Sequence, residues 1–304
     1  ASADATLNFL IMALLFAYLG QAWNVLGGYA GQFSFGHAAF FGTGAYVTAI
    51  LQVHYLWNPW AALPAAVAAG GAVGAFMGAL SFRYGLRGSY FALVTLAFAE
   101  VFRILATSAT LTGGGAGILI RLDTRPENFQ FASRAAYYYV ILALVALGLA
   151  LSRWLDRSRF GAWLTAIREN EQSAAALGVD AFRCKLAAIV LSAAMTAAGG
   201  VFYVQYFLYI DPGIAFGPRI SVEALLVPII GGLGPAFGPS LGSLVVHGLG
   251  ELVTRVAGDL PGISLLIFGI LLIVILRFLP RGLSGLLRGA LARIRSRRGD
   301  AHAA

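Results

Sequence analysis

The chain has 304 residues, of which 59% are hydrophobic and 11% charged, and its formal net charge is +8. Soluble proteins carry about 25% charged residues, so this composition, with a mean hydropathy of +0.80, excludes an ordinary soluble domain and favours a lipid environment. The positive charge gathers at the ends of apolar runs, as in cytoplasmic loops, which disfavours a nucleic-acid-binding face.

Nine apolar stretches follow one another along the chain, and most are long enough for a helix to cross the ~30 Å hydrocarbon core of a bilayer. The seventh is short and bounded by glycine, which is typical of a broken or re-entrant helix. The runs lack the two-residue alternation of membrane β-barrels. We therefore expect an all-α integral membrane protein, a polytopic bundle of about nine transmembrane helices with glycine-rich broken or re-entrant segments. The stretches run roughly over 8–27, 36–53, 59–82, 88–110, 136–152, 186–207, 221–232, 236–256 and 262–279.

A glycine-rich segment with polar side chains lies between the first two stretches. Glycine with Gln, Ser and His at membrane depth predicts a backbone that leaves the helix, which is tolerated only beside protein or a water-filled cavity. Open N–H groups at half-helix ends suit the carboxylate of a small zwitterion. The competing interpretation is a tight, buried helix–helix turn that needs glycine for space. The candidate translocation residues here are Gly28, Gly31, Gln32, Ser34 and His37.

Two patterns stand out in the third and fourth stretches. Gly70, Gly74 and Gly78 recur every four residues, which indicates close helix packing. Glu100 and Arg103 are three residues apart and could neutralise one another on one helix face. Ionisable residues inside a membrane are functional candidates, but we favour a structural pair here.

The segment 158–180 is expected to be a cytoplasmic loop that contains a short amphipathic helix. Its apolar residues fall at i, i+3, i+4 and i+7, the spacing of one helical face: Phe160, Trp163, Leu164 and Ile167. A small-residue surface ending at Gly178 follows, and Asp180 is a plausible N-cap for the next helix. The amphipathic helix could lie at the membrane interface or present a knob to a cytoplasmic partner. The pattern leaves both interpretations open.

A second glycine-rich segment lies between the seventh and eighth stretches. Its candidate translocation residues are Gly231, Gly232 and Gly234. The segment loosely resembles the first, with a Gly-Gly pair followed by Phe before Gly. Paired glycine-interrupted segments in two halves of a transporter often point to internal repeats, but the match is too short to decide between a repeat and coincidence.

Arginine clusters set the expected orientation. Basic residues at 83–87, throughout 153–185 and after the last stretch predict three cytoplasmic regions. The N-terminus and 111–135 would then be outside and the C-terminus inside. We expect one transmembrane domain over 1–280 and a basic cytoplasmic tail over 281–304, which would meet anionic lipid.

Several sites are not expected in this chain. Lys185 is the single lysine and follows Cys184, so no glycine-lysine phosphate loop exists and ATP binding by a Walker motif is excluded. The single cysteine excludes an internal disulfide and a cysteine-rich metal site. No HExxH or G-x-S-x-G motif appears, and no metal site is predicted. No basic stretch precedes the first apolar run, so we expect no signal peptide.

The ordered motifs resemble the permease subunits of branched-chain amino acid ABC importers, of the LivM type. The most distinctive run, from Gly28 to Tyr46, contains Gly-Tyr-Ala-Gly-Gln-Phe-Ser-Phe-Gly-His. The second permease of such systems, of the LivH type, lacks the Gly-Tyr-Ala-Gly-Gln pattern. LivM-like chains usually carry one more hydrophobic segment before the one at 8–27, so the number of crossings ahead of it is left open. The other matching runs are 86–100, 112–114, 158–161, 166–178 and 227–242.

The resemblance implies a function and a set of partners. The region 1–280 would be a permease domain in the bacterial inner membrane, and 158–180 would carry the coupling helix that docks in a groove of the ATPase. The partners would be a LivH-type permease, two cytoplasmic ATPases that bind ATP and Mg, and a periplasmic amino-acid-binding protein. This chain would bind no cofactor and catalyse no reaction. The implied coupling residues are Arg168, Glu169, Glu171, Ala174, Ala175, Leu177 and Gly178.

Other functions remain open at this stage. Relatives of this permease type move urea, short amides or aromatic acids, and no residue here excludes that cargo. An ion-coupled secondary transporter would need a membrane-buried carboxylate, for which Glu100 is the candidate. A non-transporting scaffold would have little use for broken, glycine-rich segments.

Overall fold

Long apolar helices build the protein. The computed structural model describes residues 2–234, 236–257, 269–270 and 282–285. Eight of the nine predicted stretches fall on helices there, and the ninth, 262–279, lies outside the described residues except at 269–270. The long helices are α1 (Ser2–Asn24), α2 (His37–Tyr55), α3 (Pro59–Arg83), α4 (Gly88–Ser108), α5 (Arg134–Arg157), α8 (Ala181–Phe207), α10 (Pro218–Gly231) and α11 (Gly238–Ala257).

Shorter elements connect the long helices. They are the π-helix η1 (Val25–Tyr29), the 3₁₀ turns η2 (Gly114–Ala116) and η3 (Pro126–Asn128), the helices α6 (Arg159–Glu169), α7 (Glu171–Ala176) and α9 (Pro212–Phe216), and the strands β1 (Ile118–Leu119) and β2 (Tyr209–Ile210). The two strands pair antiparallel over two residues each. They link two loops and leave the helical class of the fold unchanged.

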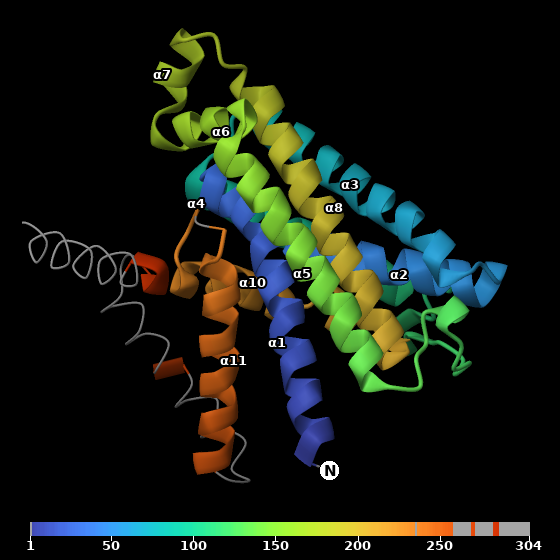
Figure 1. The fold of residues 1–304 in the computed structure, drawn as a ribbon. Helices are drawn as coiled ribbons and strands as arrows, with labels where there is room; N and C mark the ends of the chain where they lie inside the picture. The colour runs from blue at the N-terminus through green and yellow to red at the C-terminus, as the bar shows by residue number, and fades with distance from the viewer. Residues whose placement is uncertain (1, 235, 258–268, 271–281, 286–304) are drawn as a thin grey trace, which may run out of the picture.

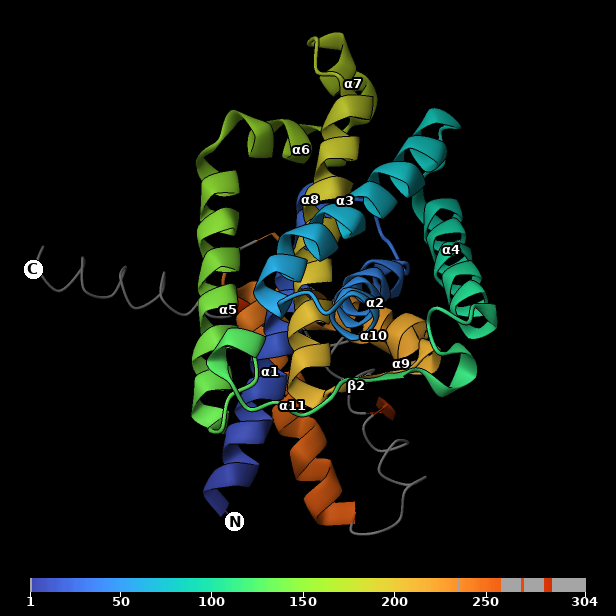
Figure 2. The same cartoon turned by 90° about the vertical axis from the view of Figure 1, so that its right-hand side faces the viewer.

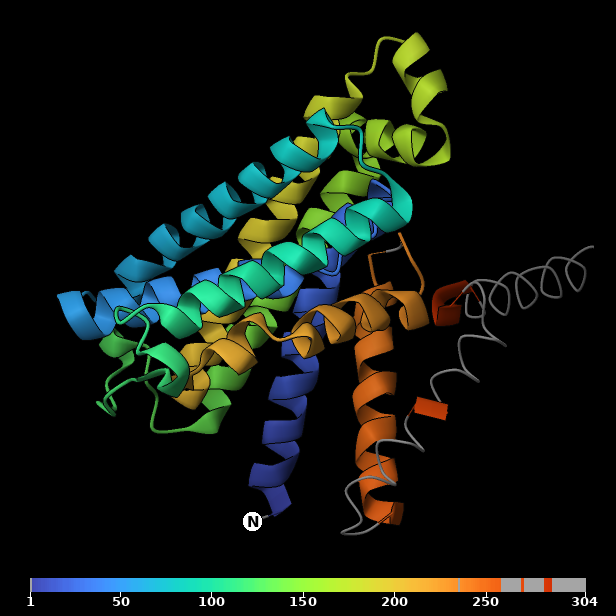
Figure 3. The same cartoon turned by 180° about the vertical axis from the view of Figure 1, so that it is seen from behind.

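Six helical segments in the described part of the chain are long and apolar enough to cross a membrane. They are Asp4–Tyr29, Pro59–Arg83, Gly88–Ser108, Arg134–Arg157, Ala181–Phe207 and Pro212–Gly231. This is the architecture of an all-α, multi-pass membrane protein, as the composition predicts. Helices α2 and α10 cross the upright helices α1 and α11 at a steep angle (Figure 3).

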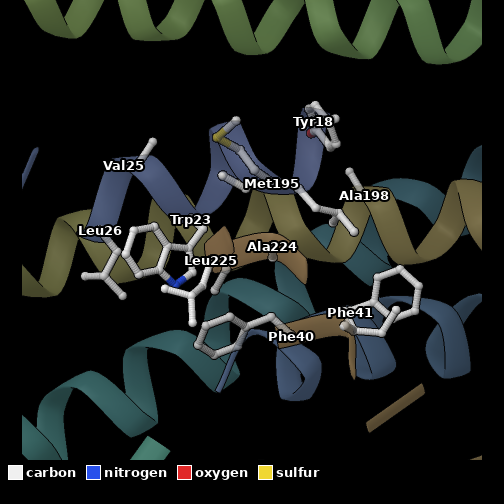
Figure 4. Close-up of a cluster of buried hydrophobic side chains, with 14 of the residues drawn as sticks. Tyr18, Trp23, Val25, Leu26, Phe40, Phe41, Met195, Ala198, Ala224 and Leu225 are labelled. Carbon is white, nitrogen blue, oxygen red and sulfur yellow. The ribbon is translucent and has the colours of Figure 1, made fainter. Parts of the chain in front are cut away.

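The core lies where α1, α2, α8 and α10 meet. The side chains of Trp23, Phe40, Phe41 and Val201 are fully buried. Figure 4 shows side chains of the four helices converging on this cluster. Close packing between α3 and α8 extends the core, because the regularly spaced glycines of α3 (Gly70, Gly74 and Gly78) lie against α8. A Cβ added at Gly74 would lie 2.5 Å from the Cβ of Ala193, so glycine sets the distance between these two helices.

The loops separate into two ends. At one end, Arg134 donates to the carbonyl of Asp4 at 3.2 Å, and Asn58 donates to the carbonyl of Glu127 at 2.7 Å. At the other end, Arg87 in the α3–α4 turn pairs with a residue of α7, and α7 projects beyond the other helices, with α6 below it (Figures 1 and 2). The basic regions at 83–87 and 153–185 therefore share one end, as predicted.

Candidate functional site

The two glycine-rich segments, far apart in the sequence, meet at the end of the bundle that carries α6 and α7. The side chain of Asn24 accepts a hydrogen bond from the N–H of Gly234 at 3.0 Å and donates one to the carbonyl of Gly234 at 3.4 Å. A Cβ at Gly28 would lie 3.1 Å from the backbone nitrogen of Gly234. We call this meeting point, formed by residues 24–31, 231–234 and 236–238, the glycine junction.

The first segment leaves the helix through a widened turn. Helix α1 continues into the π-helix η1, and an irregular stretch then leads to α2. Gly31 has φ +67, a left-handed conformation that side chains disfavour, and a Cβ there would lie 2.6 Å from Cγ of Arg168. A bulkier residue at Gly31 would therefore meet both backbone strain and the side chain of α6.

Arg168 points from α6 into the glycine junction. Its Nη1 donates to the carbonyl of Gly28 at 2.7 Å, while its Nη2 donates to the carboxylate of Glu169 at 2.8 Å. The same Nη1 lies 3.8 Å from the position of a Cβ on Gly234. Its side chain is 35% exposed. The family resemblance implied a coupling role for Arg168, and nothing in the spacing of the sequence showed that its side chain turns inward.

Polar groups of the first segment bond to nearby backbone. Trp23 donates from Nε1 to the carbonyl of Ser34 at 2.8 Å, and the Oγ of Ser34 accepts from the N–H of Gly36 at 3.1 Å. Gln32 donates to the carbonyl of Ala30 at 3.1 Å, and its Oε1 is a buried atom with no partner within the described residues. These bonds satisfy backbone groups that the irregular chain cannot pair by itself.

His37 ties three helices together in the core. It is fully buried, and its Nε2 lies 2.9 Å from the Oγ of Ser192 on α8. That hydroxyl donates its single hydrogen to the carbonyl of Ala22 at 2.6 Å, so it must accept from His37. We therefore assign the proton of His37 to Nε2. The residue holds α1, α2 and α8 in register.

The second segment is built by close backbone contact. A Cβ at Gly231 would collide with the carbonyl of Gly238 and lie 2.9 Å from the nitrogen of Gly242, so α10 and α11 touch through their backbones. Gly232 and Gly234 have φ values of 111 and 95, which lets the chain reverse in a few residues.

A cation–π contact adds a link from this segment to α5. The guanidinium of Arg153, near the end of α5, lies 4.7 Å from the ring centroid of Phe237. Such contacts are electrostatic attractions to the ring face. The glycine junction is thus held by side chains from α1, α5 and α6.

Capping residues define α6 and α7. Ser158 accepts from the N–H of Gly161 at 3.0 Å, and Asn170 accepts from the N–H of Ser173 at 2.9 Å. Asp180 accepts from the N–H of Arg183 at 3.0 Å, which confirms it as the N-cap of α8. Asn170 interrupts the helix between α6 and α7.

The apolar stripe of α6 faces the bundle in part. Leu164 and Ile167 are buried, whereas Trp163 is 45% exposed. Phe160 packs against the edge of the core. The predicted amphipathic helix is therefore present, and it is docked on the bundle through two of its apolar positions.

Helix α7 is anchored by Glu171. One carboxylate oxygen accepts from the Nζ of Lys185 at 2.8 Å, and the other lies 3.3 Å from Nε of Arg87. The Lys185 side chain is 4% exposed, and its Nζ lies 5.1 Å from the ring centroid of Phe82. Removal of Glu171 would leave the buried charge of Lys185 without a partner, which would strongly destabilise the fold. The role of Lys185 was missed from the sequence because its partner lies 14 residues away on another helix.

The remaining coupling residues differ in accessibility. Leu177 is 85% exposed and Ala174 is 2% exposed. Glu169, Ala175 and Gly178 are exposed. A partner protein could therefore reach the end of α7 and Glu169, while Ala174 packs inside the chain.

On α4, Glu100 and Arg103 form the ion pair that the sequence predicts. Arg103 donates two hydrogen bonds to Glu100, at 2.9 Å and 2.6 Å, on the surface of α4, so the pair inferred from the sequence is present. Within the part of the chain that the structure describes, no three His, Cys, Asp or Glu residues are close enough to hold a metal ion.

Comparison with known proteins places these features in one family. Residues 5–276 match the family described as "Branched-chain amino acid transport system / permease component". The high-affinity branched-chain amino acid transport system permease protein LivM of Salmonella typhimurium is 30% identical over 296 residues, covering 90% of this chain and 68% of that protein. LivM of Escherichia coli K12 is also 30% identical, over 302 residues, covering 91% and 69%.

The LivH type of permease is also similar. LivH of Escherichia coli K12 is 23% identical over 299 residues, covering 91% of this chain and 94% of that protein. The lower identity agrees with the preference for the LivM type that the first glycine-rich segment gave. No solved structure matches this chain significantly.

Proposed function

Because the chain belongs to the branched-chain amino acid transport system permease family, we propose that it is the membrane subunit of an ABC importer that carries branched-chain amino acids across the bacterial inner membrane. The names of the LivM relatives, which match nine-tenths of this chain, support this cargo. The chain itself supplies the pathway, and ATP hydrolysis takes place on other subunits.

The partners follow from the same relationship. A LivH-type permease would pair with this chain, two cytoplasmic ATPases would bind ATP and Mg, and a periplasmic binding protein would deliver the amino acid. This chain would bind no cofactor. The similarity to LivH over 91% of this chain supports a pairing of two related permeases, as in many pseudo-symmetric transporters.

The topology that fits these partners has about nine crossings. The six spanning segments, α2, α11 and the stretch 262–279 would make that number. The glycine-rich segments would act as broken or re-entrant elements, because irregular backbone at membrane depth needs protein or a cavity around it. The arginines near α6 would put this end, and the C-terminus, in the cytoplasm. Most of the tail 281–304 lies outside the described residues.

The observation that carries the coupling role is the construction of α6 and α7. Helix α6 is docked on the bundle, α7 projects beyond it, and Glu171 braces α7 to Lys185 and Arg87. The exposed Leu177 stands at its outer end. We call α6 and α7 together the knob. A rigid knob with an apolar residue at its tip suits a groove on a cytoplasmic ATPase. Closure of the ATPase pair would push this knob, and the bundle would rock between outward-open and inward-open states.

Retention of the ATPase tests the coupling role. We expect Leu177→Arg to release the ATPase subunits during purification of the full complex, while the permease stays folded. Leu122→Arg is the matched control, because Leu122 is also exposed, at 69%, and lies in the loop at the opposite end. Glu171 is less suitable, since its replacement would free α7 itself. Full retention of the ATPases by Leu177→Arg would contradict the proposed docking surface.

Uptake by proteoliposomes tests the cargo. The complete complex with its binding protein should take up leucine, isoleucine and valine when ATP is supplied. Preferred uptake of urea, a short amide or an aromatic acid would replace the cargo and keep the class. Uptake by this chain alone, driven by an ion gradient, would overturn the ABC assignment.

A further inference from the structure

Besides the apolar contacts of α6, two separate polar routes connect α6 and α7 to the long helices of the bundle. Glu171, at the start of α7, leads through Lys185 to α8 and through Arg87 to the α3–α4 turn. Arg168, two residues before the break at Asn170, leads to the glycine junction instead. The first route braces the knob, and the second reaches both glycine-rich segments.

The contact between Arg168 and the first segment is specific to an arginine. Its Nη1 donates to Gly28 while Nε and Nη2 both donate to Glu169. A guanidinium can make these bonds together because its donors form a planar fork, whereas a lysine amine is a point donor. The aliphatic part of Arg168 also lies where a Cβ on Gly31 would be. The glycine there is what lets the arginine reach the Gly28 carbonyl.

The second segment is tied to the same point. Asn24 holds both backbone groups of Gly234, and Asn24 immediately precedes the π-helix that contains Gly28. A displacement of Gly28 therefore moves the residues that bind Gly234. Arg168 itself lies near Gly234, on the same side of the junction.

We propose that Arg168 is a positioning residue that transmits the displacement of α6 to both glycine-rich segments together, so that they move as one gate at the cytoplasmic end. The proposal rests on the coupling role of α6 and α7. It gives Arg168 an inward task, distinct from contact with the ATPase surface. Loss of its side chain would leave the knob docked and the ATPase active, but the junction would no longer follow the knob.

The first experiment compares transport with ATP hydrolysis in the reconstituted complex. Arg168→Gln should keep the ATPases bound and hydrolysing, yet lower the amount of amino acid moved per ATP at least tenfold. Arg168→Lys should restore part of this ratio. Arg183→Gln is the matched control, because Arg183 lies at the same end of the bundle, is 86% exposed and pairs with Asp180. Its ratio should match that of the unmodified complex.

The second experiment reads the junction directly and needs no knowledge of the cargo. With Cys184 replaced by alanine, a cysteine is introduced by Leu233→Cys, at a position that is 38% exposed beside Gly234. Its labelling rate by a membrane-impermeant maleimide in inside-out vesicles should differ several-fold between nucleotide-free and vanadate-trapped complex. In combination with Arg168→Gln this difference should disappear while hydrolysis continues.

The outcomes separate this proposal from the proposed function. Loss of the ATPases from Arg168→Gln would make Arg168 a docking residue and overturn the positioning role. A proportional loss of transport and hydrolysis in Arg168→Gln would also overturn the positioning role. So would a labelling difference at Leu233→Cys, between nucleotide-free and vanadate-trapped complex, that Arg168→Gln leaves unchanged. Failure of the unmodified complex to move branched-chain amino acids would contradict the cargo alone, because the labelling experiment would still decide the role of Arg168.

Discussion

The two glycine-rich segments use glycine for different purposes. In the first, glycines make room for side chains: Gly27 lies against the ring of Trp23, and Gly31 lies against the stem of Arg168. In the second, Gly231 and Gly242 let α10 and α11 touch backbone to backbone. Side chains can change rotamer, whereas backbone atoms of two packed helices have no alternative position.

This difference predicts how each segment behaves when the transporter moves. The first segment should deform, because its contacts are side chains and a widened helical turn, and π-helical turns are common at functional sites. The second should move as a rigid unit formed by α10 and α11. The following substitutions test that comparison, from the largest expected effect to the smallest.

Gly231→Ala should be the most damaging substitution. Its methyl group would meet the carbonyl of Gly238 and the nitrogen of Gly242, and neither can move without separating the helices. We expect a loss of about 3 kcal/mol of stability, measured as a large fall in the apparent melting temperature and yield in detergent. Gly248→Ala is the control, because a Cβ at Gly248 meets nothing within 4 Å. Equal tolerance of both substitutions would refute the rigid contact.

Asn24→Ala should separate the two glycine-rich segments without disturbing the contact between α10 and α11. The backbone N–H and carbonyl of Gly234 would lose their partner, at a cost of about 2 kcal/mol. The melting temperature should fall, and the maleimide reactivity of Leu233→Cys should rise. Asn128→Ala removes a comparable hydrogen bond, to Asp123 at 2.8 Å, in the loop at the opposite end, and should leave that reactivity unchanged.

Gly31→Ala should be tolerated better than Gly231→Ala, because its neighbour is a flexible side chain. The left-handed backbone alone should cost about 1 to 2 kcal/mol. Gly85→Ala isolates this strain, since Gly85 has φ +68 and a Cβ there meets nothing within 4 Å. Any additional destabilisation of Gly31→Ala measures the Arg168 contact, and it should vanish when Arg168 is also replaced by alanine. If it persists, the contact is not the cause.

Arg153→Gln should have the smallest effect. It removes the cation–π contact with Phe237, which is worth about 0.5 to 1 kcal/mol at a partly exposed site. The change in melting temperature should be small but larger than that of Arg157→Gln, a substitution one turn further along α5. No difference between the two would mean that Phe237 does not need Arg153.

Local patterns predicted the helices well and their ends less well. The stretch predicted at 136–152 forms a helix over Arg134–Arg157, because polar residues continue a helix beyond its apolar part. The N-cap at Asp180 was found because a capping side chain acts within three residues of its own position. The regular spacing of glycines on α3 likewise predicted close helix packing, and the structure shows that α8 is the neighbouring helix.

Contacts between distant residues could not be predicted in this way. Asn24 and Gly234 are 210 residues apart, and Arg168 and Gly28 are 140 apart. The two glycine-rich segments loosely resemble each other, which left open whether they form a repeat, and no periodicity shows that they touch. The family resemblance implied that Glu171 and Ala174 belong to a contact surface, but it could not show that Glu171 bonds to Lys185 or that Ala174 is 2% exposed.

The position of Lys185 gives the protein a built-in chemical reporter. It is the single lysine of the chain, and its amine is shielded beneath α7 by Glu171 and Phe82. Acylating reagents, which attack an accessible and unprotonated amine, should therefore spare this side chain while α7 is seated. Mass spectrometry that found Lys185 acylated during turnover would time the lifting of α7 without any engineered label.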